Sequence, residues 1–332
     1  MARPLRLEFP GAIYHVINRG NYRGDIFRTE GAKAAFERCL WDACQKSGWV
    51  LHAYVLMRNH YHLALETPEG NLGVGMQWLQ GTFANRFNKL RGERGHLFQG
   101  RYKSLLVEQG EALGQVCHYI HLNPVRAGVI PVARLAEYRF SSYWQLWHPA
   151  ARPAFLCVAT ALDHAGGYPD TRPGWKAYAQ YLAWQTASGP AGKSAAYACL
   201  SKGWALGSKE FKTGLVEDHA ALATSVAWES AGKPEIRRLH WATQLTKCLH
   251  VLGKTTAAAK SERKSAPWKV ATAAFLKQHT QANNGWLATQ LHMGGPVAVS
   301  HYVGTLQRQP AHPGNVFLDR LTARINNRPE WR

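Results

Sequence analysis

The stretch Met57-Arg58-Asn59-His60-Tyr61-His62-Leu63-Ala64-Leu65-Glu66 decides how the first half of this chain is interpreted. From His60 onward, a bulky apolar residue occupies every second position, and alternate side chains of a β-strand point to opposite faces. His60 and His62 would therefore share one face. Tyr61, Leu63 and Leu65 would share the other face, which can enter a core. The pattern predicts a strand that presents two imidazoles from a rigid element.

The flanking segments predict further strands and helices, separated by turn residues. β-Branched and aromatic residues favour strands at 12–18, 51–57 and 102–108, besides the strand that begins at His60. Helical spacing of apolar residues favours helices at 29–47, 72–90 and 111–123. This order fits an α+β fold with an antiparallel sheet and helices on one face, in the ferredoxin-like manner. We expect the uncovered face of the sheet to carry His60 and His62.

A second informative stretch is Tyr119-Ile120-His121-Leu122-Asn123-Pro124-Val125-Arg126, in the last predicted helix of this unit. Tyr119 and Asn123 are four residues apart, so a helix places one above the other. Pro124 should end the helix, because the residue before a proline avoids α-helical geometry. One helix is thus expected to deliver both a phenol and an amide to the same place.

Together these side chains have the chemistry of a metal-assisted phosphodiester transfer. That reaction needs a nucleophile in line with the leaving oxygen and a cation that polarises the phosphate. We expect Tyr119 to be the nucleophile, and His60, His62 and Asn123 to bind a divalent ion, Mg²⁺ or Mn²⁺. Either motif alone would be more common as packing or as solvent-exposed surface. Their combination with this strand order and a basic chain favours the functional interpretation.

Composition restricts the class of partner. The chain has 332 residues, long enough for two domains, and 40 Lys and Arg against 21 Asp and Glu give a net charge of +19. This excess favours nucleic acid first and an anionic membrane surface second. No apolar run approaches the roughly 20 residues of a membrane span, and no signal peptide is evident. The six cysteines form no Cys-x-x-Cys pair, which favours reduced thiols in a cytosol.

Three parts are expected along the chain: 1–150 as the nuclease domain, 151–262 as a helical extension and linker, and 263–332 as a DNA-binding region. Residues 255–265 in particular are small, basic and polar, as in a linker. The last part has three short helical patterns with Gly294-Gly295 before the third, which resembles a helix-turn-helix. Ser300 and His301 would then meet base edges, with Lys264, Lys269 and Arg308 available to phosphates.

Further DNA contacts are expected from basic and amide side chains near the two motifs. Phosphate groups are bound by such side chains, and interleaved aromatic rings can stack on bases. The expected contacts are Arg19, Asn21, Arg23, Arg86, Lys89, Arg91, Arg94, Arg101, Lys103 and Arg126. For any single residue of the basic run from Arg86 to Lys103, a solvated helix end is an equally good explanation, and the alternative for Arg126 is that it caps nearby carbonyls.

Five stretches in order resemble the REP-associated tyrosine transposases, a branch of the HUH single-tyrosine endonucleases, over roughly residues 8–147. They are residues 14–21 (YHVINRGN), 57–63 (MRNHYHL), 95–103 (GHLFQGRYK), 119–128 (YIHLNPVRAG) and 138–143 (YRFSSY). Residues 203–211 look like a segment of the longer members.

The resemblance implies specific roles and a specific reaction. It implies that His60 and His62 are the HUH pair, Tyr119 the nucleophile and Asn123 the third metal-side residue. It also implies cleavage of single-stranded DNA beside hairpin-forming repeats through a 5′-phosphotyrosine, which leaves a free 3′-hydroxyl. A cytoplasmic, nucleoid-associated bacterial protein, monomeric or homodimeric and without a membrane partner, is expected.

Two other functions remain open from the sequence. Asn59-His60 also suggests an HNH-type or other nuclease that uses activated water, although the strand order and Tyr119 disfavour it. A regulator with a catalytically silent nuclease domain is the other alternative, which the presence of all four expected site residues disfavours.

Overall fold

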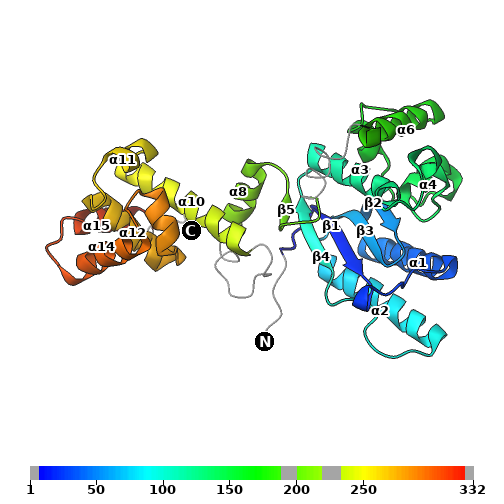
Figure 1. Ribbon diagram of the computed structural model, residues 1–332, viewed down its shortest axis with the longest axis horizontal. Coiled ribbons are helices and arrows are strands. Elements are labelled where there is room, and N and C mark those ends of the chain that lie inside the picture. The colour runs from blue at the N-terminus through cyan, green and yellow to red at the C-terminus, as the bar shows by residue number, and fades with distance from the viewer. Residues whose placement is uncertain (1–6, 188–199, 219–232, 326–332) are drawn as a thin grey trace. The chain divides into compact units, whose positions relative to one another are not determined.

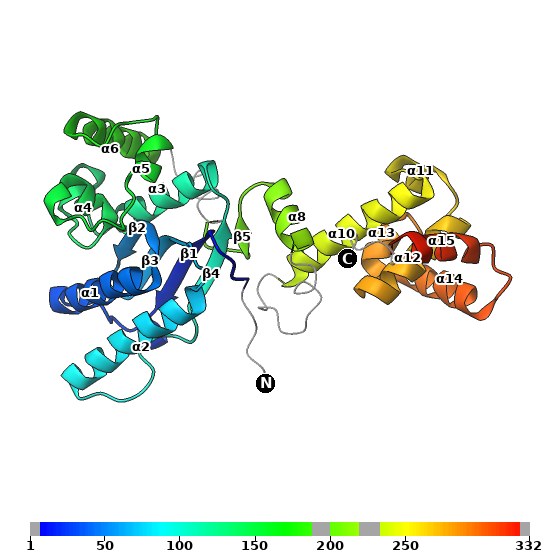
Figure 2. The same ribbon diagram turned by 180° about the vertical axis from the view of Figure 1, so that it is seen from behind.

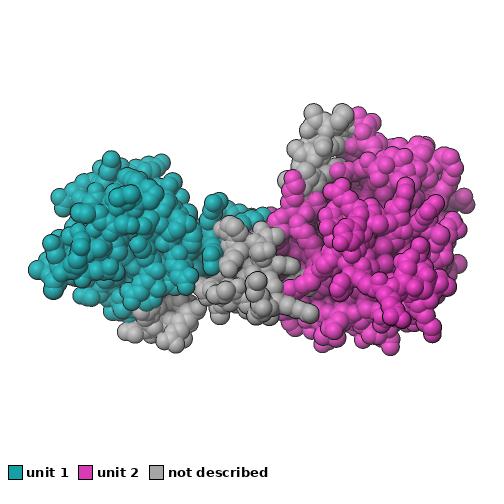
Figure 3. All heavy atoms as spheres, turned by 60° about the horizontal axis from the view of Figure 1, so that its bottom comes forward, with its two compact units in different colours: residues 1–5, 209–332 teal, residues 6–208 magenta. Residues whose placement is uncertain are grey.

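The computed structural model describes residues 7–187, 200–218 and 233–325 (Figure 1). The chain forms two compact units, Arg6–Ser208 and Lys209–Arg332 with residues 1–5, which are coloured separately in Figure 3. The structure thus divides the chain at residue 208, whereas the sequence suggested boundaries at 150 and 262. Cys199 and residues 326–332 of the expected DNA-binding region lie outside the described residues.

The first unit is built on a five-stranded sheet. Its strands are β1 (Ala12–Arg19), β2 (Val50–Leu56), β3 (His60–Thr67), β4 (Lys103–Val107) and β5 (Ala205–Leu206), in the spatial order β2-β3-β1-β4-β5. The first four pair antiparallel, in the order of a ferredoxin-like sheet. The predicted α+β fold class is therefore confirmed. The short β5 pairs parallel with β4 and was not expected from the sequence.

Helices cover both faces of this sheet, so the expectation of an uncovered face was wrong. Helices α1 (Glu30–Ser47) and α2 (Leu72–Arg91) pack on one face and α3 (Glu111–Arg126) on the other, as Figures 1 and 2 show. Tyr61 is fully buried beneath α1, with its ring 4.8 Å from that of Phe36. His62 points the opposite way, toward α3. Because α3 is itself buried along most of its length, it completes a second core instead of leaving the histidine face to solvent.

Helix α1 follows its sequence signals closely. The Thr29 hydroxyl accepts a hydrogen bond from the backbone N–H of Ala32, which caps the first turn. Gly48 ends the helix in the left-handed conformation, with φ of 64°, which glycine adopts without steric cost. Both ends of α1 were therefore predictable from local chemistry.

Helix α3 does not end before Pro124, as the sequence suggested, but continues to Arg126. A proline in a helix removes one hydrogen-bond donor and crowds the preceding turn. Here the loss falls near the helix end, where the N–H groups of Ala127 and Val129 donate to the carbonyls of Asn123 and Pro124 at 3.0 and 2.9 Å. The last residues of α3 therefore include Arg126, which contacts the ring of Tyr119.

The back of α3 is fixed by a buried hydrogen-bonded network. The hydroxyl of Tyr178, from α6 (Arg172–Ala187), lies 3.0 Å from Nδ1 of His118 and 2.7 Å from Nδ1 of His121. Nε2 of His121 lies 2.8 Å from the hydroxyl of Ser142, at the start of α4 (Ser142–Trp147). Both histidines therefore point away from the sheet and orient α3.

The segment after α3 is tied to α1. This segment contains the helical turn η2 (Val132–Glu137) and α5 (Ala159–Asp163) in addition to α4 and α6. Arg139 donates two hydrogen bonds to the carboxylate of Glu37 on α1, each of 3.0 Å. The hydroxyl of Tyr54 donates to the same carboxylate at 2.7 Å. Through Arg139, the stretch 138–143 is therefore tied to α1.

Both edges of the four antiparallel strands, β2 and β4, are covered by chain from beyond α3. The N–H groups of Leu106 and Glu108 donate to the carbonyls of Trp204 and Leu206 at one edge. At the other edge, Leu51 exchanges hydrogen bonds with Phe155 and Cys157, while the N–H of Leu56 donates to the carbonyl of Phe140. Later segments of the chain thus extend the sheet on either side.

The second unit is entirely helical in its described residues. Its helices are α8 (Lys209–Asp218), α10 (Lys233–Leu252), α11 (Thr256–Ser261), α12 (Pro267–Thr280), α13 (Asn284–Gln290), α14 (Pro296–Arg308) and α15 (Asn315–Ile325). One hydrophobic core joins α10 to α15 and includes Trp241, Phe275 and Leu321. Within the described ranges, none of the chain's helices has the length and apolar composition of a membrane span.

Residues 255–265 are part of this fold, so the expectation of a linker there was wrong. They contain α11, which is tied to α12 by a buried lysine: Nζ of Lys269 donates to the carbonyls of Ala259 and Glu262, each at 2.8 Å. The side chain of Lys269 is fully buried, so the expectation that it binds phosphate was also wrong. Composition suggested a linker because the packing surface of α11 consists of alanines.

Candidate active site

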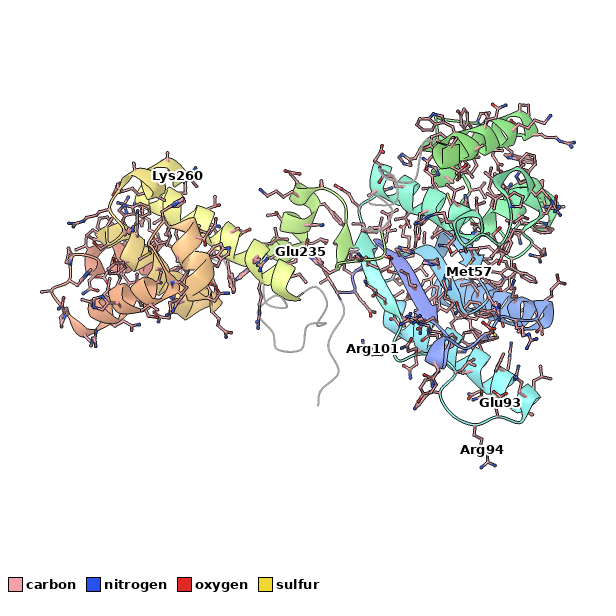
Figure 4. All side chains as sticks on the ribbon, in the orientation of Figure 1. Met57, Glu93, Arg94, Arg101, Glu235 and Lys260 are labelled. Carbon is pink, nitrogen blue, oxygen red and sulfur yellow. The ribbon has the colours of Figure 1, made fainter. Side chains whose placement is uncertain are left out.

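The structure brings the expected nucleophile and histidine pair together in one cleft. The ring centroids of His60 and His62 are 5.1 Å apart, and that of Tyr119 lies 5.4 Å from His62. All three line a cleft of about 700 Å³ at the end of the sheet. Met57 and Arg101, both labelled in Figure 4, mark the chain just before β3 and before β4. A strand thus supplies the imidazoles and a helix the phenol.

Asn123 joins the same group from the next turn of α3. Its side chain is almost fully buried and is hydrogen-bonded to the imidazole of His60. Tyr119 and Asn123 therefore face the sheet together, as their spacing of four residues predicts for a helix. The amide is placed next to one expected metal ligand and the phenol next to the other.

Each histidine has a hydrogen-bond partner on Nδ1. Nδ1 of His60 lies 2.8 Å from Oδ1 of Asn59, an oxygen that can only accept, so Nδ1 donates. Nδ1 of His62 lies 3.0 Å from Nε2 of His15, a neighbour in β1. In both rings, Nε2 is therefore the nitrogen that remains to bind a metal ion. Partners of this kind are typical of metal-binding histidines, because they fix ring orientation and tautomer.

Burial keeps both imidazoles uncharged. Loss of solvent lowers the pKa of His60, and the nearby Arg19 lowers it further, while the hydrogen bond with Asn123 opposes the shift. Burial also places the pKa of His62 well below its ordinary value, with contributions from His15, His60 and Arg126. Neutral imidazoles keep a nitrogen lone pair, which is the form that binds a metal ion.

The donor set fits a divalent ion that also takes oxygen ligands. Two imidazoles and one amide oxygen suit Mn²⁺ or Mg²⁺ if phosphate oxygen and water complete the shell. Among the described residues, no cluster of three or more His, Cys, Asp or Glu side chains is placed to hold a metal ion. His60, His62 and Asn123 would supply three ligands, which leaves positions for phosphate oxygen and water.

Four of the expected DNA-contact residues surround this group. Arg19, Arg23, Arg101 and Lys103 line the same cleft as the histidines. The sheet register explains two of them: Arg19 pairs across β1 and β3 with His60, and Lys103 pairs with Ile17, the partner of His62. Arg126 contacts the expected nucleophile, with its guanidinium 4.7 Å from the centroid of the Tyr119 ring. The cleft is therefore rimmed by positive charge.

The other expected contacts lie elsewhere. Asn21, Arg91 and Arg94 line a second, smaller hollow of about 330 Å³ beside the loop after α2, where Figure 4 labels Glu93 and Arg94. Arg91 is also paired with Glu93 at 2.7 Å. Arg86 donates to the sulfur of Cys39 at 3.3 Å, and Lys89 is exposed on α2 outside both hollows. Ser300 and His301 are on α14, in the second unit.

Several cleft residues were not expected from the sequence. Gln99 and Ser201 line the cleft, and His15 lies behind His62. The period-two rule could have identified His15, because it places this residue on the histidine face of its strand. Ser201 could not be found in this way, because it reaches the cleft through β5, which follows β4 by about a hundred residues.

Comparison with known proteins matches the first unit. Residues 9–123 match the family model described as "Transposase IS200 like". A solved structure titled "Structure of the REP associates tyrosine transposase bound to a REP hairpin" aligns with a TM-score of 0.38 and 16% identity, over 47% of this chain and 92% of that one. No curated protein matches the chain. Residues 9–123, which include the whole histidine, tyrosine and asparagine group, are thus similar to the IS200-like transposases.

Proposed function

We propose that this protein is a metal-dependent transposase that cleaves and rejoins single-stranded DNA beside a hairpin, through a 5′-phosphotyrosine intermediate. The observation that carries the proposal is that Tyr119, His60 and His62 line one cleft together with arginine and lysine side chains, and that Asn123 is hydrogen-bonded to His60. A phenol with two neutral imidazoles and cationic side chains around it suits attack on a phosphodiester. The hairpin partner is inferred from the similar protein, whose title names a REP hairpin.

The chain's own residues have distinct parts in the proposed reaction. The phenolic oxygen of Tyr119 forms a bond to phosphorus and releases its proton to water. The bond from phosphorus to the 3′ oxygen breaks, and that oxygen takes up a proton to become a free 3′-hydroxyl. His60, His62 and Asn123 would hold a divalent ion that, when bound, polarises the phosphate. Reversal of the same step by another 3′-hydroxyl would rejoin the strand.

The rim of the cleft accounts for the preference for a flexible strand. Arg19, Arg101 and Lys103 would neutralise the phosphates on either side of the scissile one. Tyr119 is only 8% exposed, so the reacting phosphate must enter the cleft to meet it. A single strand can bend into such a site, whereas a duplex must first be distorted.

We also propose that α13 and α14 form the helix-turn-helix of a DNA-reading unit. The turn between them has left-handed backbone at His292 and Gly294, and the two helices pack against each other. On α14, Val299, Val303 and Leu306 are buried, while Val297, Ser300 and His301 are exposed on the opposite side. The second helix of such a motif enters the major groove with its first residues at the base edges. A hairpin stem would provide that groove.

The test is a covalent-adduct assay on the full-length protein. A labelled oligonucleotide with a hairpin and a single-stranded flank is incubated with protein and Mn²⁺, and the products are separated under denaturing conditions. We expect a protein–DNA adduct that disappears in Tyr119→Phe. Tyr168→Phe, which removes the same atom from a half-buried tyrosine outside the cleft, should keep the adduct.

Each alternative function gives a different result in this assay. Free cut ends without an adduct would mean that activated water is the nucleophile. Binding without cutting would mean a regulator. A perfect duplex cut as readily as the flanking single strand would contradict the proposed substrate.

A further inference from the structure

His15 is buried behind the candidate metal ligand His62, and it has two partners of different kinds. Its Nδ1 lies 2.7 Å from the carbonyl oxygen of Leu200, and its Nε2 lies 3.0 Å from Nδ1 of His62. The planes of the two imidazoles are tilted by only 27°. His15 has no exposed surface at all, and His62 is 4% exposed. The three groups therefore form a hydrogen-bonded chain inside the protein.

The direction of the hydrogen bonds in this chain follows from its first acceptor. A carbonyl oxygen only accepts, so Nδ1 of His15 donates to Leu200. A neutral imidazole has one N–H, so Nε2 of His15 accepts, and Nδ1 of His62 must donate to it. Nε2 of His62 is then left with its lone pair. The carbonyl of Leu200 thereby determines which nitrogen of His62 can bind a cation.

We propose that His15 is a positioning residue that holds His62 in its Nδ1–H tautomer, with the carbonyl of Leu200 as the fixed end of the chain. This inference rests on the proposed function, because it takes His62 to be a metal ligand. It extends the site beyond the family-matched residues 9–123, since Leu200 lies after them. The segment from Leu200 to Leu206 is then part of the site in addition to extending the sheet.

Hydrogen bonds of the neighbouring residues hold Leu200 in place. Nζ of Lys103 donates to the carbonyl of Ser201 at 2.6 Å. β5 follows directly, and both the N–H and the hydroxyl of Ser208 donate to the carboxylate of Glu108, at 2.6 and 2.9 Å. Because Lys103 begins β4 and Glu108 directly follows it, the segment is fixed at both ends against the strand that also lines the cleft. Such an anchor can orient a hydrogen-bond chain, whereas a loosely held loop could not.

Two substitutions of His15 separate the effect of its hydrogen bond from the effect of its size. His15→Phe keeps a planar ring of similar size but offers no acceptor to Nδ1 of His62. His15→Gln can place an amide oxygen near the position of Nε2 and so restore the acceptor. Loss of an outer partner of a metal-binding histidine typically weakens metal binding by 10- to 100-fold. We expect a loss of that size in the phenylalanine variant and at most a few-fold loss in the glutamine variant.

The first measurement is the tautomer of His62 in metal-free, full-length protein, read from long-range proton–nitrogen correlation spectra of isotope-labelled samples. The wild-type protein and His15→Gln should show the Nδ1–H form, and His15→Phe should show the Nε2–H form or a mixture. An Nε2–H form in the wild-type protein would overturn the proposal. This readout needs neither DNA nor activity.

The second measurement is calorimetric titration with Mn²⁺ alone, with circular dichroism to confirm that each variant is folded. Equal Mn²⁺ affinity in the wild-type protein and His15→Phe would also overturn the proposal. If the wild-type protein bound no Mn²⁺, the metal-dependent function would fail. The tautomer spectrum would still decide whether His15 orients His62.

Discussion

The guanidinium of Arg126 lies over the ring of Tyr119, 4.7 Å from its centroid. The two residues are about two helical turns apart, so α3 must continue past Pro124 to place them on the same side. A cation over an aromatic face is attracted to the π electrons of the ring and fixes the ring's orientation. Arg126 is also exposed to solvent, where it can meet an incoming phosphate. One side chain thus contacts the expected nucleophile and is open to the substrate.

Replacement of Arg126 should therefore slow the chemical step. Cation–π contacts contribute about 0.5 to 2 kcal/mol, which corresponds to a roughly 2- to 30-fold lower rate. We expect Arg126→Gln to lower the single-turnover rate of adduct formation by this factor at saturating DNA. Arg126→Lys should recover part of the rate, because it keeps the charge. An unchanged rate in the glutamine variant would show that the contact has no catalytic role.

The three proposed metal ligands should differ in importance. His60→Ala and His62→Ala each remove an imidazole, and we expect both to lower Mn²⁺ affinity by more than the roughly 10- to 100-fold typical of outer partners. Asn123→Ala should lower it less, because an amide is the weaker ligand. The measurement is Mn²⁺ titration followed by the adduct assay. His148→Ala, an exposed histidine outside the cleft, is the matched control. Full activity in excess chelator would contradict a metal-dependent reaction.

The second unit should increase affinity for the hairpin without taking part in chemistry. A truncation at residue 263 would divide the core shared by α10 and α12 and leave Trp241 without its packing partners. We therefore expect the informative change to be His301→Glu in the full chain, which places a negative charge on the exposed face of α14. Hairpin binding should weaken several-fold, and adduct formation at saturating protein should be unchanged.

His250→Glu is the matched control for this experiment. It makes the same change of charge at an exposed position of α10 in the same unit. Equal binding by both variants and the wild-type protein would remove α14 from the DNA interface. Equal weakening by both would indicate only a general effect of charge.

Stability should fall as the solution becomes acidic. Burial lowers the pKa of His118 to about 4 and that of His121 to about 3, from an ordinary value of about 6.5. Below that value the unfolded chain binds protons that the folded protein excludes, so the free energy of unfolding decreases as the pH falls. The slope should be about 1.4 kcal/mol per pH unit for each histidine. Above about pH 7 this contribution should be constant.

Urea unfolding at a series of pH values measures this dependence. The glutamine of His118→Gln does not titrate. This variant should therefore lose the contribution of one histidine, about 1.4 kcal/mol per pH unit, from the slope between about pH 6.5 and 4. His148→Gln, at an exposed position, is the matched control. A free energy of unfolding that is the same at pH 7 and pH 5 would contradict the assignment of neutral, buried histidines behind α3.

The sequence predicts the strand and the helix face of this site well, because the spacing of nearby residues determines both. The alternation around His60 fixes a strand, and the spacing of Tyr119 and Asn123 fixes a helix face. The strand order then brings the two together, since only a few sheet topologies fit that order. The roles of these residues stay predictions until the adduct and metal experiments are done.

What the sequence does not predict depends on distant pairing or on tertiary packing. The bond between His15 and Leu200 joins residues 185 positions apart, and no local pattern encodes it. The prediction for Pro124 was wrong because a preference of one residue was outweighed by the buried surroundings of α3. Lys269 was expected at a surface because lysine usually is, whereas two carbonyls hold it in the interior.

The covered edges of the sheet affect which fragments of this protein stay in solution. An uncovered edge strand offers unpaired backbone groups to any other extended chain, and this is a common route to aggregation. In this protein the edges are closed by Phe140, Phe155, Cys157, Trp204 and Leu206, all of which lie outside residues 9–123. A fragment cut to the family-matched residues would expose β2 and β4 together, so we expect it to precipitate even though it contains every proposed catalytic group.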